Sequence, residues 1–235
     1  MLKPATRTLV TFLLDRTGSM EPIRDDTIGA FDAYLEGLQK GGAPIDFTFV
    51  QFDSMSIDKI YVQTPVGQVP RLTRDTYQPR ASTPLIDAAY KKVQAVEDSF
   101  AGDRETKVVI CFHTDGQENS STEHTWDELN ALIKEKSRAG SQFNFMGVGI
   151  DAYHQRTRMG IAPQATVAYD HRNAEATRMA FGASAENARR YACAQATDTR
   201  YAPSKKASAG DRFFDNVVKK AKRVLKKPIV DDIKL

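Results

Sequence analysis

Short apolar runs alternate with amphipathic stretches along most of the 235-residue chain. Thr8–Leu14 is a continuous apolar run that ends at an aspartate, which is typical of a strand buried on both faces. Apolar residues then recur at helical spacing until Gly41-Gly42, which ends the pattern. The same alternation of strand-like and helix-like segments continues to Cys193.

This alternation predicts an α/β fold. The strands are expected at residues 8–14, 47–52, 59–66, 107–112, 143–150 and 165–169. The helices are expected at residues 22–38, 85–96, 126–138, shortly after Asp151, and 174–193. Strands separated by helices of this length favour a doubly wound, mostly parallel sheet with helices on both faces, so we assign residues 1–196 to one domain.

The C-terminal part of the chain has a different pattern. Residues 197–210 are rich in Ala, Ser, Lys and Thr and are typical of a linker. Residues 211–235 are predicted to contain a basic amphipathic helix, which ends at Pro228. The residues expected to dock this helix on another surface are Phe214, Val217, Val218, Lys219, Lys220, Lys222 and Arg223. That surface is the domain itself, a second copy or another protein; nucleic acid is an alternative only for this basic tail.

Charge and composition narrow the class of protein. The net charge of +3 combines about +7 in residues 200–235 with about −4 in the rest, so the basic character belongs to the tail. No apolar run approaches the ~20 residues of a transmembrane helix, and the opening residues lack the apolar core of a signal peptide. We therefore expect a cytoplasmic protein, or a virion protein, with Cys111 and Cys193 reduced.

Polar clusters follow the ends of the predicted strands. Asp15, Thr17 and Ser19 follow the first strand, Thr114-Asp115-Gly116 follows the fourth, and Thr83 opens the second helix. In a parallel sheet these strand ends share one edge, where ligands gather. Carboxylate and hydroxyl oxygens without soft ligands suit a hard cation such as Mg²⁺. Taken singly, each cluster is more simply explained as a turn or a helix cap.

Together the three clusters resemble a known family. The segments Asp15–Met20, Ser82–Ala88 and Thr114–Asn119 are similar to the three loops of the metal-ion-dependent adhesion site of von Willebrand factor type A domains. The resemblance covers roughly residues 6–195. It implies that Mg²⁺, or Mn²⁺ or Ca²⁺, is surrounded by Asp15, Thr17, Ser19, Thr83 and Asp115. The family usually has Ser at the position of Thr17, and Thr retains the hydroxyl oxygen.

The resemblance also implies a function and a partner. Members of the family generally bind proteins, often through an acidic side chain of the partner that completes the metal shell, and the small bacterial and phage members are the most similar. The residues expected to contact such a partner are Arg80, Gln117, Glu118 and Asn119. A homo-oligomer or larger assembly is a further expectation.

Other sequence features favour ordinary structural roles. His113 adjoins the predicted site, but the four histidines are scattered without ligand spacing, so a structural or an exposed position is preferred to a metal-binding or catalytic role. No Gly-x-Ser-x-Gly nucleophile motif and no phosphate-binding loop is present, and Gly147-Val148-Gly149 lacks the third glycine of a dinucleotide fingerprint. We therefore expect a metal-dependent protein-binding module and not an enzyme. The alternatives are a structural component of an assembly such as a phage particle, with the basic tail as anchor, and a metal-dependent hydrolase.

Overall fold

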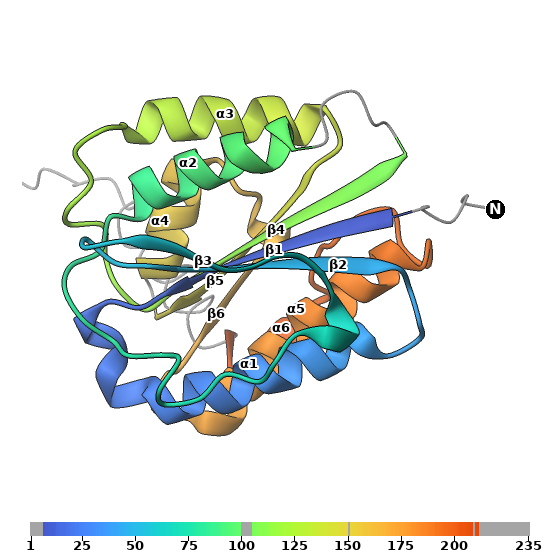
Figure 1. The fold of residues 1–235 in the computed structure, drawn as a ribbon, viewed down its shortest axis with the longest axis horizontal. Coiled ribbons are helices and arrows are strands. Elements are labelled where there is room, and N and C mark those ends of the chain that lie inside the picture. Colours follow the sequence, from blue (N-terminus) through green and yellow to red (C-terminus); the bar gives the residue numbers. More distant parts are fainter. Residues whose placement is uncertain (1–6, 100–104, 150, 209, 212–235) are drawn as a thin grey trace, which may run out of the picture.

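A six-stranded sheet forms the centre of the protein (Figure 1). The computed structural model describes residues 7–99, 105–149, 151–208 and 210–211. The strands are β1 (Arg7–Asp15), β2 (Ile45–Phe52), β3 (Ile57–Pro65), β4 (Thr106–Thr114), β5 (Gln142–Val148) and β6 (Thr166–Tyr169). They lie in the order β3-β2-β1-β4-β5-β6, and only β3 is antiparallel to its neighbour. The predicted fold class is confirmed, and every strand lies within two residues of its expected bounds.

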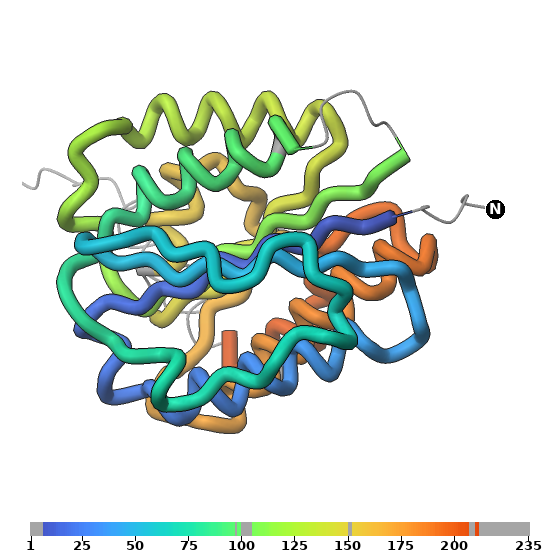
Figure 2. Tube along the Cα trace, in the orientation of Figure 1, coloured from blue at the N-terminus to red at the C-terminus, as the bar shows by residue number. Residues whose placement is uncertain are grey.

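Helices cover both faces of the sheet, as the tube in Figure 2 also shows. The α-helices are α1 (Arg24–Gln39), α2 (Leu85–Asp98), α3 (Trp126–Arg138), α4 (Asp151–Met159), α5 (Ala174–Ala192) and α6 (Pro203–Ser208). Helices α2, α3 and α4 lie on one face, and α1, α5 and α6 lie on the other. A short 3-10 helix, η1 (Gly18–Ile23), leads into α1, where the sequence predicted only a polar turn and the first helical residues.

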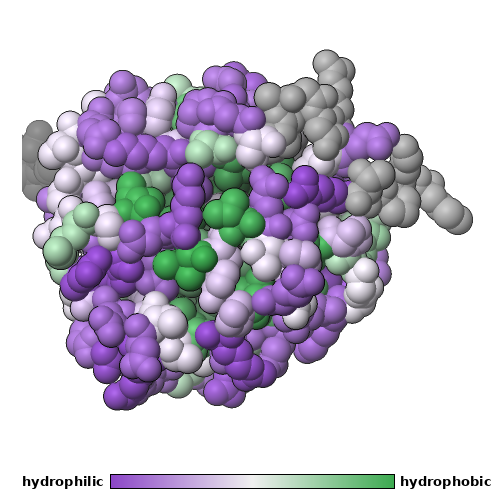
Figure 3. All heavy atoms as spheres, viewed as in Figure 1, coloured by the Kyte–Doolittle hydropathy of each residue, from purple (hydrophilic) through white to green (hydrophobic). Residues whose placement is uncertain are grey.

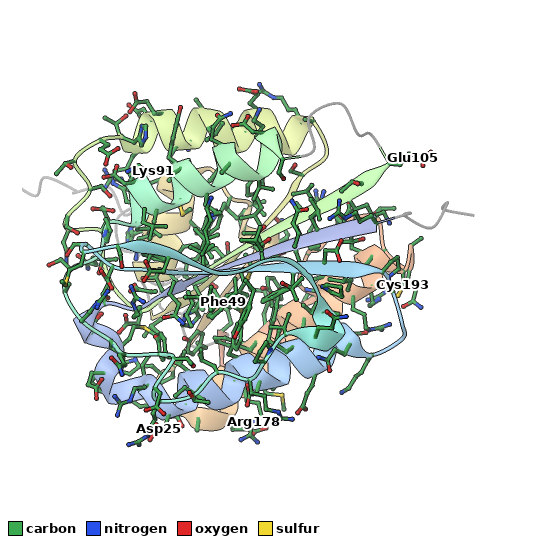
Figure 4. All side chains as sticks on the ribbon, in the orientation of Figure 1. Asp25, Phe49, Lys91, Glu105, Arg178 and Cys193 are labelled. Carbon is green, nitrogen blue, oxygen red and sulfur yellow. The ribbon has the colours of Figure 1, made fainter. Side chains whose placement is uncertain are left out.

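Alternating side chains of the strands supply the two apolar cores. On β1, Val10, Phe12 and Leu14 face α1 and α5, whereas Leu13 faces α2 and α3. The core between the sheet and α1 is rich in aromatic rings; Phe49 lies within it (Figure 4), 4.4 Å from Phe31 between ring centroids. Since both faces of the central strands are covered, their sequences are continuous apolar runs.

The two helices on the aromatic face approach each other closely. A Cβ atom added at Gly37 of α1 would lie 2.7 Å from the Cβ atom of Ala185 in α5. Gly29, in the same helix, has no atom within 4 Å of the equivalent position. The absence of a side chain at Gly37 therefore permits the α1–α5 contact.

The chain order gives the sheet a switch point between its two central strands. From β1 the chain moves outward to β2 and β3, then returns to place β4 on the other side of β1, and continues to β5 and β6. The carboxyl ends of β1 and β4 therefore diverge into loops on opposite sides of one crevice. Such crevices are the usual ligand sites of open α/β sheets.

Residues 197–208 pack on the domain, in contrast to the predicted linker. Tyr201 is buried and its backbone N–H donates to Gln164 O (2.7 Å), while Asn144 Nδ2 donates to Thr199 O (3.0 Å). The segment therefore belongs to the folded body. The sequence did not predict this packing, because the buried residues of the segment are isolated and lack the regular spacing of an amphipathic helix.

Asp211 holds the end of this segment against α4 and β6. Its buried carboxylate accepts hydrogen bonds from the Tyr153 hydroxyl and the Ala168 N–H, and it lies 3.2 Å from Lys206 Nζ. Burial raises the pKa of Asp211 despite these partners. The predicted tail-docking residues, Phe214 to Arg223, lie outside the described residues.

Two further expectations concern the cysteines and the membrane. Cys111 is buried, Cys193 is half-buried, and both are free thiols. In the described part of the chain, no helix has the length and apolar character needed to cross a membrane.

Candidate metal centre

The carboxylate of Asp15 lies at the carboxyl end of β1 and is fully buried. Its Oδ1 atom accepts a hydrogen bond from the Thr17 N–H (2.7 Å). Its Oδ2 atom accepts one from the Thr114 hydroxyl at the end of β4 (2.5 Å). Because β1 and β4 are parallel neighbours, these contacts hold the carboxylate at the switch point of the sheet.

The hydroxyl groups of Thr17 and Ser19 connect this carboxylate to a second one. Thr17 Oγ1 and Ser19 Oγ are 3.1 Å apart, and Ser19 Oγ donates to Asp115 Oδ1 (2.8 Å). Thr17 is buried, whereas Ser19 is exposed and Asp115 is half-buried. The cluster therefore has a buried floor and a side that is open to solvent.

Gly116 shows how closely the oxygen atoms from the three loops converge. A Cβ atom built on Gly116 would lie 3.1 Å from Thr83 Oγ1, 3.3 Å from Ser19 Oγ and 3.8 Å from Asp15 Oδ2. A single small space beside Gly116, in the loop after β4, is thus bordered by oxygens from the end of β1, from η1 and from Thr83, just before α2. A side chain at residue 116 would occupy that space.

Thr83 is held in place by the loop that follows β4. Its backbone N–H donates to Asn119 Oδ1 (2.8 Å), and Asn119 N–H donates to Thr83 O (3.1 Å). Only 3% of Thr83 is exposed. These reciprocal bonds fix the hydroxyl of Thr83 relative to Asp115, four residues before Asn119.

The electrostatics of the cluster favour a bound cation. Burial, with a further contribution from Asp115, raises the pKa of Asp15 to about 7, although Thr114 and Thr17 donate to its carboxylate. Burial also raises the pKa of Asp115. Two carboxyl groups that are difficult to ionise, close together, become easier to ionise when a cation balances their charge.

The donor set fits a hard divalent ion. Every side-chain donor is a carboxylate or hydroxyl oxygen, which Mg²⁺, Mn²⁺ and Ca²⁺ accept and which soft metals do not prefer. The described residues contain no group of three or more His, Cys, Asp or Glu side chains placed to hold a metal. The hydroxyls of Thr17, Ser19 and Thr83 are therefore essential to any metal site here.

The structure brings together all five predicted metal ligands, and it reveals a supporting framework that the motif did not include. The hydroxyl of Tyr77 donates to Asp15 O (2.6 Å), and Tyr77 itself is buried. Arg16, between two predicted ligands, donates from Nε to Asp53 Oδ2 (2.9 Å). The sequence shows only that a basic residue directly follows Asp15, and the burial of Arg16 became visible only in the structure.

The predicted partner-binding residues divide into two groups. The Glu118 carboxylate accepts hydrogen bonds from the backbone N–H groups of Ile86, Ser120 and Ser121, at 2.7–2.9 Å, and Asn119 holds Thr83. Arg80 Nε donates to Asp53 Oδ2 (2.9 Å), although 46% of its side chain is exposed. Glu118, Asn119 and Arg80 therefore have hydrogen-bond partners within the domain. Asn119 and Arg80 are also exposed, and contact of these residues with a partner protein stays a prediction. Gln117 is exposed beside the cluster.

His113 has the structural role that the sequence indicated. It is fully buried, its Nε2 atom is hydrogen-bonded to the Tyr169 hydroxyl, and its ring stacks on that of Phe12. Burial lowers its pKa to about 3, so the ring is neutral at physiological pH.

Comparison with solved structures identifies the fold. A von Willebrand factor type A protein from Catenulispora acidiphila matches with a TM-score of 0.54 and 14% identity, over 79% of this chain and 43% of that one. Proximal thread matrix protein 1 from the mussel byssus matches with a TM-score of 0.52 and 11% identity, over 77% of this chain and 46% of that one. The manganese-loaded TRAP protein of Plasmodium vivax matches with a TM-score of 0.52 and 15% identity, over 76% of this chain and 74% of that one.

These matches extend the resemblance seen in the three loops to the whole sheet. The chain spans less than half the length of the first two structures. No family model and no curated protein sequence matches the chain. Its strand order, its helical layers and its structural neighbours agree: the chain folds as a von Willebrand factor type A domain.

Proposed function

We propose that this protein is a binding module that uses a divalent cation to hold an acidic side chain of a partner protein. Asp15, Thr17, Ser19, Thr83 and Asp115 would hold the ion, directly or through water. The observation that carries the proposal is the convergence of the Asp15, Ser19 and Thr83 oxygens beside Gly116, together with the hydrogen bond that joins Ser19 to Asp115. The manganese-loaded state of TRAP, which has the same fold, supports it.

The arrangement of burial favours a role in binding. The floor of the cluster is buried, so the cation would be held from one side by Asp15, Thr17 and Thr83. Ser19 and Asp115 lie at the open side, where a carboxylate from outside can approach. Mg²⁺ takes about six oxygen ligands, and the proposed set leaves positions for water or for that carboxylate.

The proposal assigns no catalytic step to the site. The histidine that adjoins the site in sequence, His113, is neutral, buried and hydrogen-bonded to Tyr169, so the proposal gives it no role as a base. Ser19 donates its hydroxyl proton to Asp115, which makes Ser19 a positioning donor for that carboxylate.

Calorimetric titration of the full chain with Mg²⁺, Mn²⁺ and Ca²⁺ tests the site. Thr83→Val removes one proposed ligand oxygen while keeping the shape of the side chain, and it should weaken Mg²⁺ binding at least tenfold. Thr8→Val is the matched control, because Thr8 is equally buried but lies at the opposite end of β1. Equal Mg²⁺ affinity in both variants would contradict the proposed site.

A further inference from the structure

A pocket lies at the edge of the sheet opposite the metal centre. Its volume is about 360 Å³, and it adjoins the amino ends of β5 and β6, where Gln142 begins β5 and Ala165 directly precedes β6. The last turns of α3 form one wall, and residues 160–162 and 199–200 complete it. The metal loops follow the carboxyl ends of β1 and β4, so the length of the strands separates the two sites.

The C-terminal segment that packs on the domain fixes one wall of this pocket. Thr199 O accepts from Asn144 Nδ2 (3.0 Å), and Tyr201 N–H donates to Gln164 O (2.7 Å). Arg200 stands between these two anchored residues, and its side chain lines the pocket. The backbone that carries Arg200 is therefore held in place by β5 and by the residues before β6.

The charged residues that line the pocket are all basic. Lys134 and Arg138 come from the last turns of α3, and Arg200 comes from the C-terminal segment. Among the described residues, no aspartate or glutamate lines the pocket. The dipole of α3 accounts for Arg138 in its last turn, but it does not account for Arg200. Three like charges around one space repel one another, and an anion between them would relieve that repulsion.

The neighbouring acids do not neutralise these cations. Glu135 pairs with Lys136 (3.0 Å), and the two α3 cations of the pocket have no ion-pair partner in the described part of the chain. Arg200 Nε lies 3.4 Å from Asp198 Oδ2, but 64% of the Arg200 side chain is exposed. Its guanidinium group therefore keeps N–H donors for a ligand.

The interior of the pocket is neutral and largely buried. Ser141 is 7% exposed and Thr199 is 2% exposed, and both residues carry hydroxyl groups. Phe143 and Ile161, which are also buried, add apolar surface. A cationic rim above an apolar interior that includes hydroxyl groups fits an anion that carries an organic group.

We propose that this pocket binds the phosphate group of a small organic phosphate ester, with the organic part against Phe143 and Ile161. Guanidinium groups match phosphate oxygens in a forked geometry, and a phosphate monoester carries about two negative charges at pH 7. The volume lies in the range of small-molecule sites, about 300–1,000 Å³, and exceeds the needs of a phosphate group alone. The inference goes beyond the proposed metal-dependent function and does not depend on it.

Titration of the full chain with three probes tests the pocket. Phenyl phosphate carries the charge and a ring, inorganic phosphate carries only the charge, and phenol carries only the ring. The titrations are followed by amide spectra at low ionic strength and without added metal. We expect phenyl phosphate to bind about tenfold more tightly than inorganic phosphate, and phenol to show no measurable binding. The shifted amides should belong to residues 138–143, 160–162 and 199–200.

Two variants separate the pocket from general attraction to a basic protein. Arg138→Gln removes one pocket cation at an exposed position, and it should weaken phenyl phosphate binding at least fivefold. Arg178→Gln is the matched control, because it removes the same charge from α5, across the sheet from α3 (Figure 4), where 64% of the Arg178 side chain is exposed. It should bind phenyl phosphate as the wild type does.

The outcomes decide the inference without reference to the metal. Weaker binding in Arg138→Gln alone, with amide shifts at the pocket, supports it. Equal weakening in both variants, or amide shifts elsewhere in the domain, overturns the pocket as the site. Inorganic phosphate that binds as tightly as phenyl phosphate overturns the organic ligand. Since no metal is present in these titrations, each of these failures leaves the proposed metal-dependent function standing.

Discussion

Asp15 holds its carboxylate where a negative charge is costly. The side chain is fully buried, its pKa is about 7, and Asp115 adds a second acid nearby. In the unfolded chain the same group ionises near its ordinary pKa of 3.8. The folded protein without a cation therefore binds a proton more tightly than the unfolded chain does, and its stability falls as the pH rises from about 4 through 7.

Asp15→Asn should make the metal-free protein more stable at pH 8, by about 2–4 kcal/mol, because it removes the buried charge. The amide can still accept from Thr17 N–H, and its NH₂ group can donate to Thr114 Oγ1. At pH 5 the advantage should be smaller, because Asp15 is then protonated in the folded wild type and only its ionisation in the unfolded chain still favours unfolding. Urea denaturation in EDTA at both pH values measures this, and calorimetry should show that Mg²⁺ binding is lost. A variant no more stable than the wild type at pH 8 would contradict the cost assigned to Asp15.

Glu118 provides a test of the role that the structure gives it. Glu118→Ala leaves three backbone N–H groups of the loop and of α2 without their acceptor, so the free energy of unfolding should fall by about 2–3 kcal/mol. Gln117→Ala, at the exposed neighbouring position, should leave it unchanged. Chemical denaturation measures the free energy of unfolding of both variants. Equal values would contradict the structural role of Glu118.

At this scale the sequence indicates ligand atoms better than it indicates their supports. Asp15 and Asp115 are recognisable because acids directly after buried strands must meet at one edge of a parallel sheet. Glu118 and Asn119 stand in the same motif, but they accept hydrogen bonds from the backbone of Ile86 in α2 and of Thr83 just before it. Contacts between a side chain and a distant backbone leave no pattern of residue types, so their roles became visible only in the fold.

Among the elements, the contact between α1 and α5 depends on one glycine. Gly37→Ala should lower the free energy of unfolding by about 1–3 kcal/mol, because its Cβ atom would meet Ala185 at 2.7 Å. Gly29→Ala, in the same helix but beside open space, should raise it by up to about 1 kcal/mol through helix propensity alone. Opposite signs in urea denaturation are the expected result, and stabilisation by both substitutions would mean that the helices can separate freely.

The elements themselves were largely predictable. All strands except β3 are buried along most of their length. Helix α3 begins at the predicted residue, Trp126, after a reciprocal cap between Thr125 and Glu128. Edge strand β3 is half-exposed, and Figure 3 shows small apolar areas on that side, separated by hydrophilic ones. Helix α6 could not be foreseen, because it is short and its segment is held by single residues such as Tyr201.

For the whole molecule, the boundary of the folded unit lies beyond residue 196. A chain that ends after Asp211 should keep its melting temperature and its Mg²⁺ affinity, since every described contact remains. A chain that ends at residue 196 removes the buried Tyr201 and Asp211, and should lose about 3 kcal/mol of stability or more. Thermal melts of the two truncated chains test this. Equal melting temperatures would mean that residues 197–211 do not stabilise the domain, as expected of a linker.

The distance along the chain between β1 and β4 has a kinetic consequence. The bond from Thr114 to Asp15 joins residues 99 positions apart, so the cation site forms only when the central strands have paired across a long loop. A cation that binds after this step stabilises the native state and leaves the rate-limiting folding barrier untouched. In stopped-flow experiments Mg²⁺ should therefore slow unfolding and leave the refolding rate unchanged, so that bound metal sets how long the folded molecule persists. Faster refolding in Mg²⁺ would instead mean that β1 and β4 have already paired, and the cation site has formed, in the rate-limiting transition state.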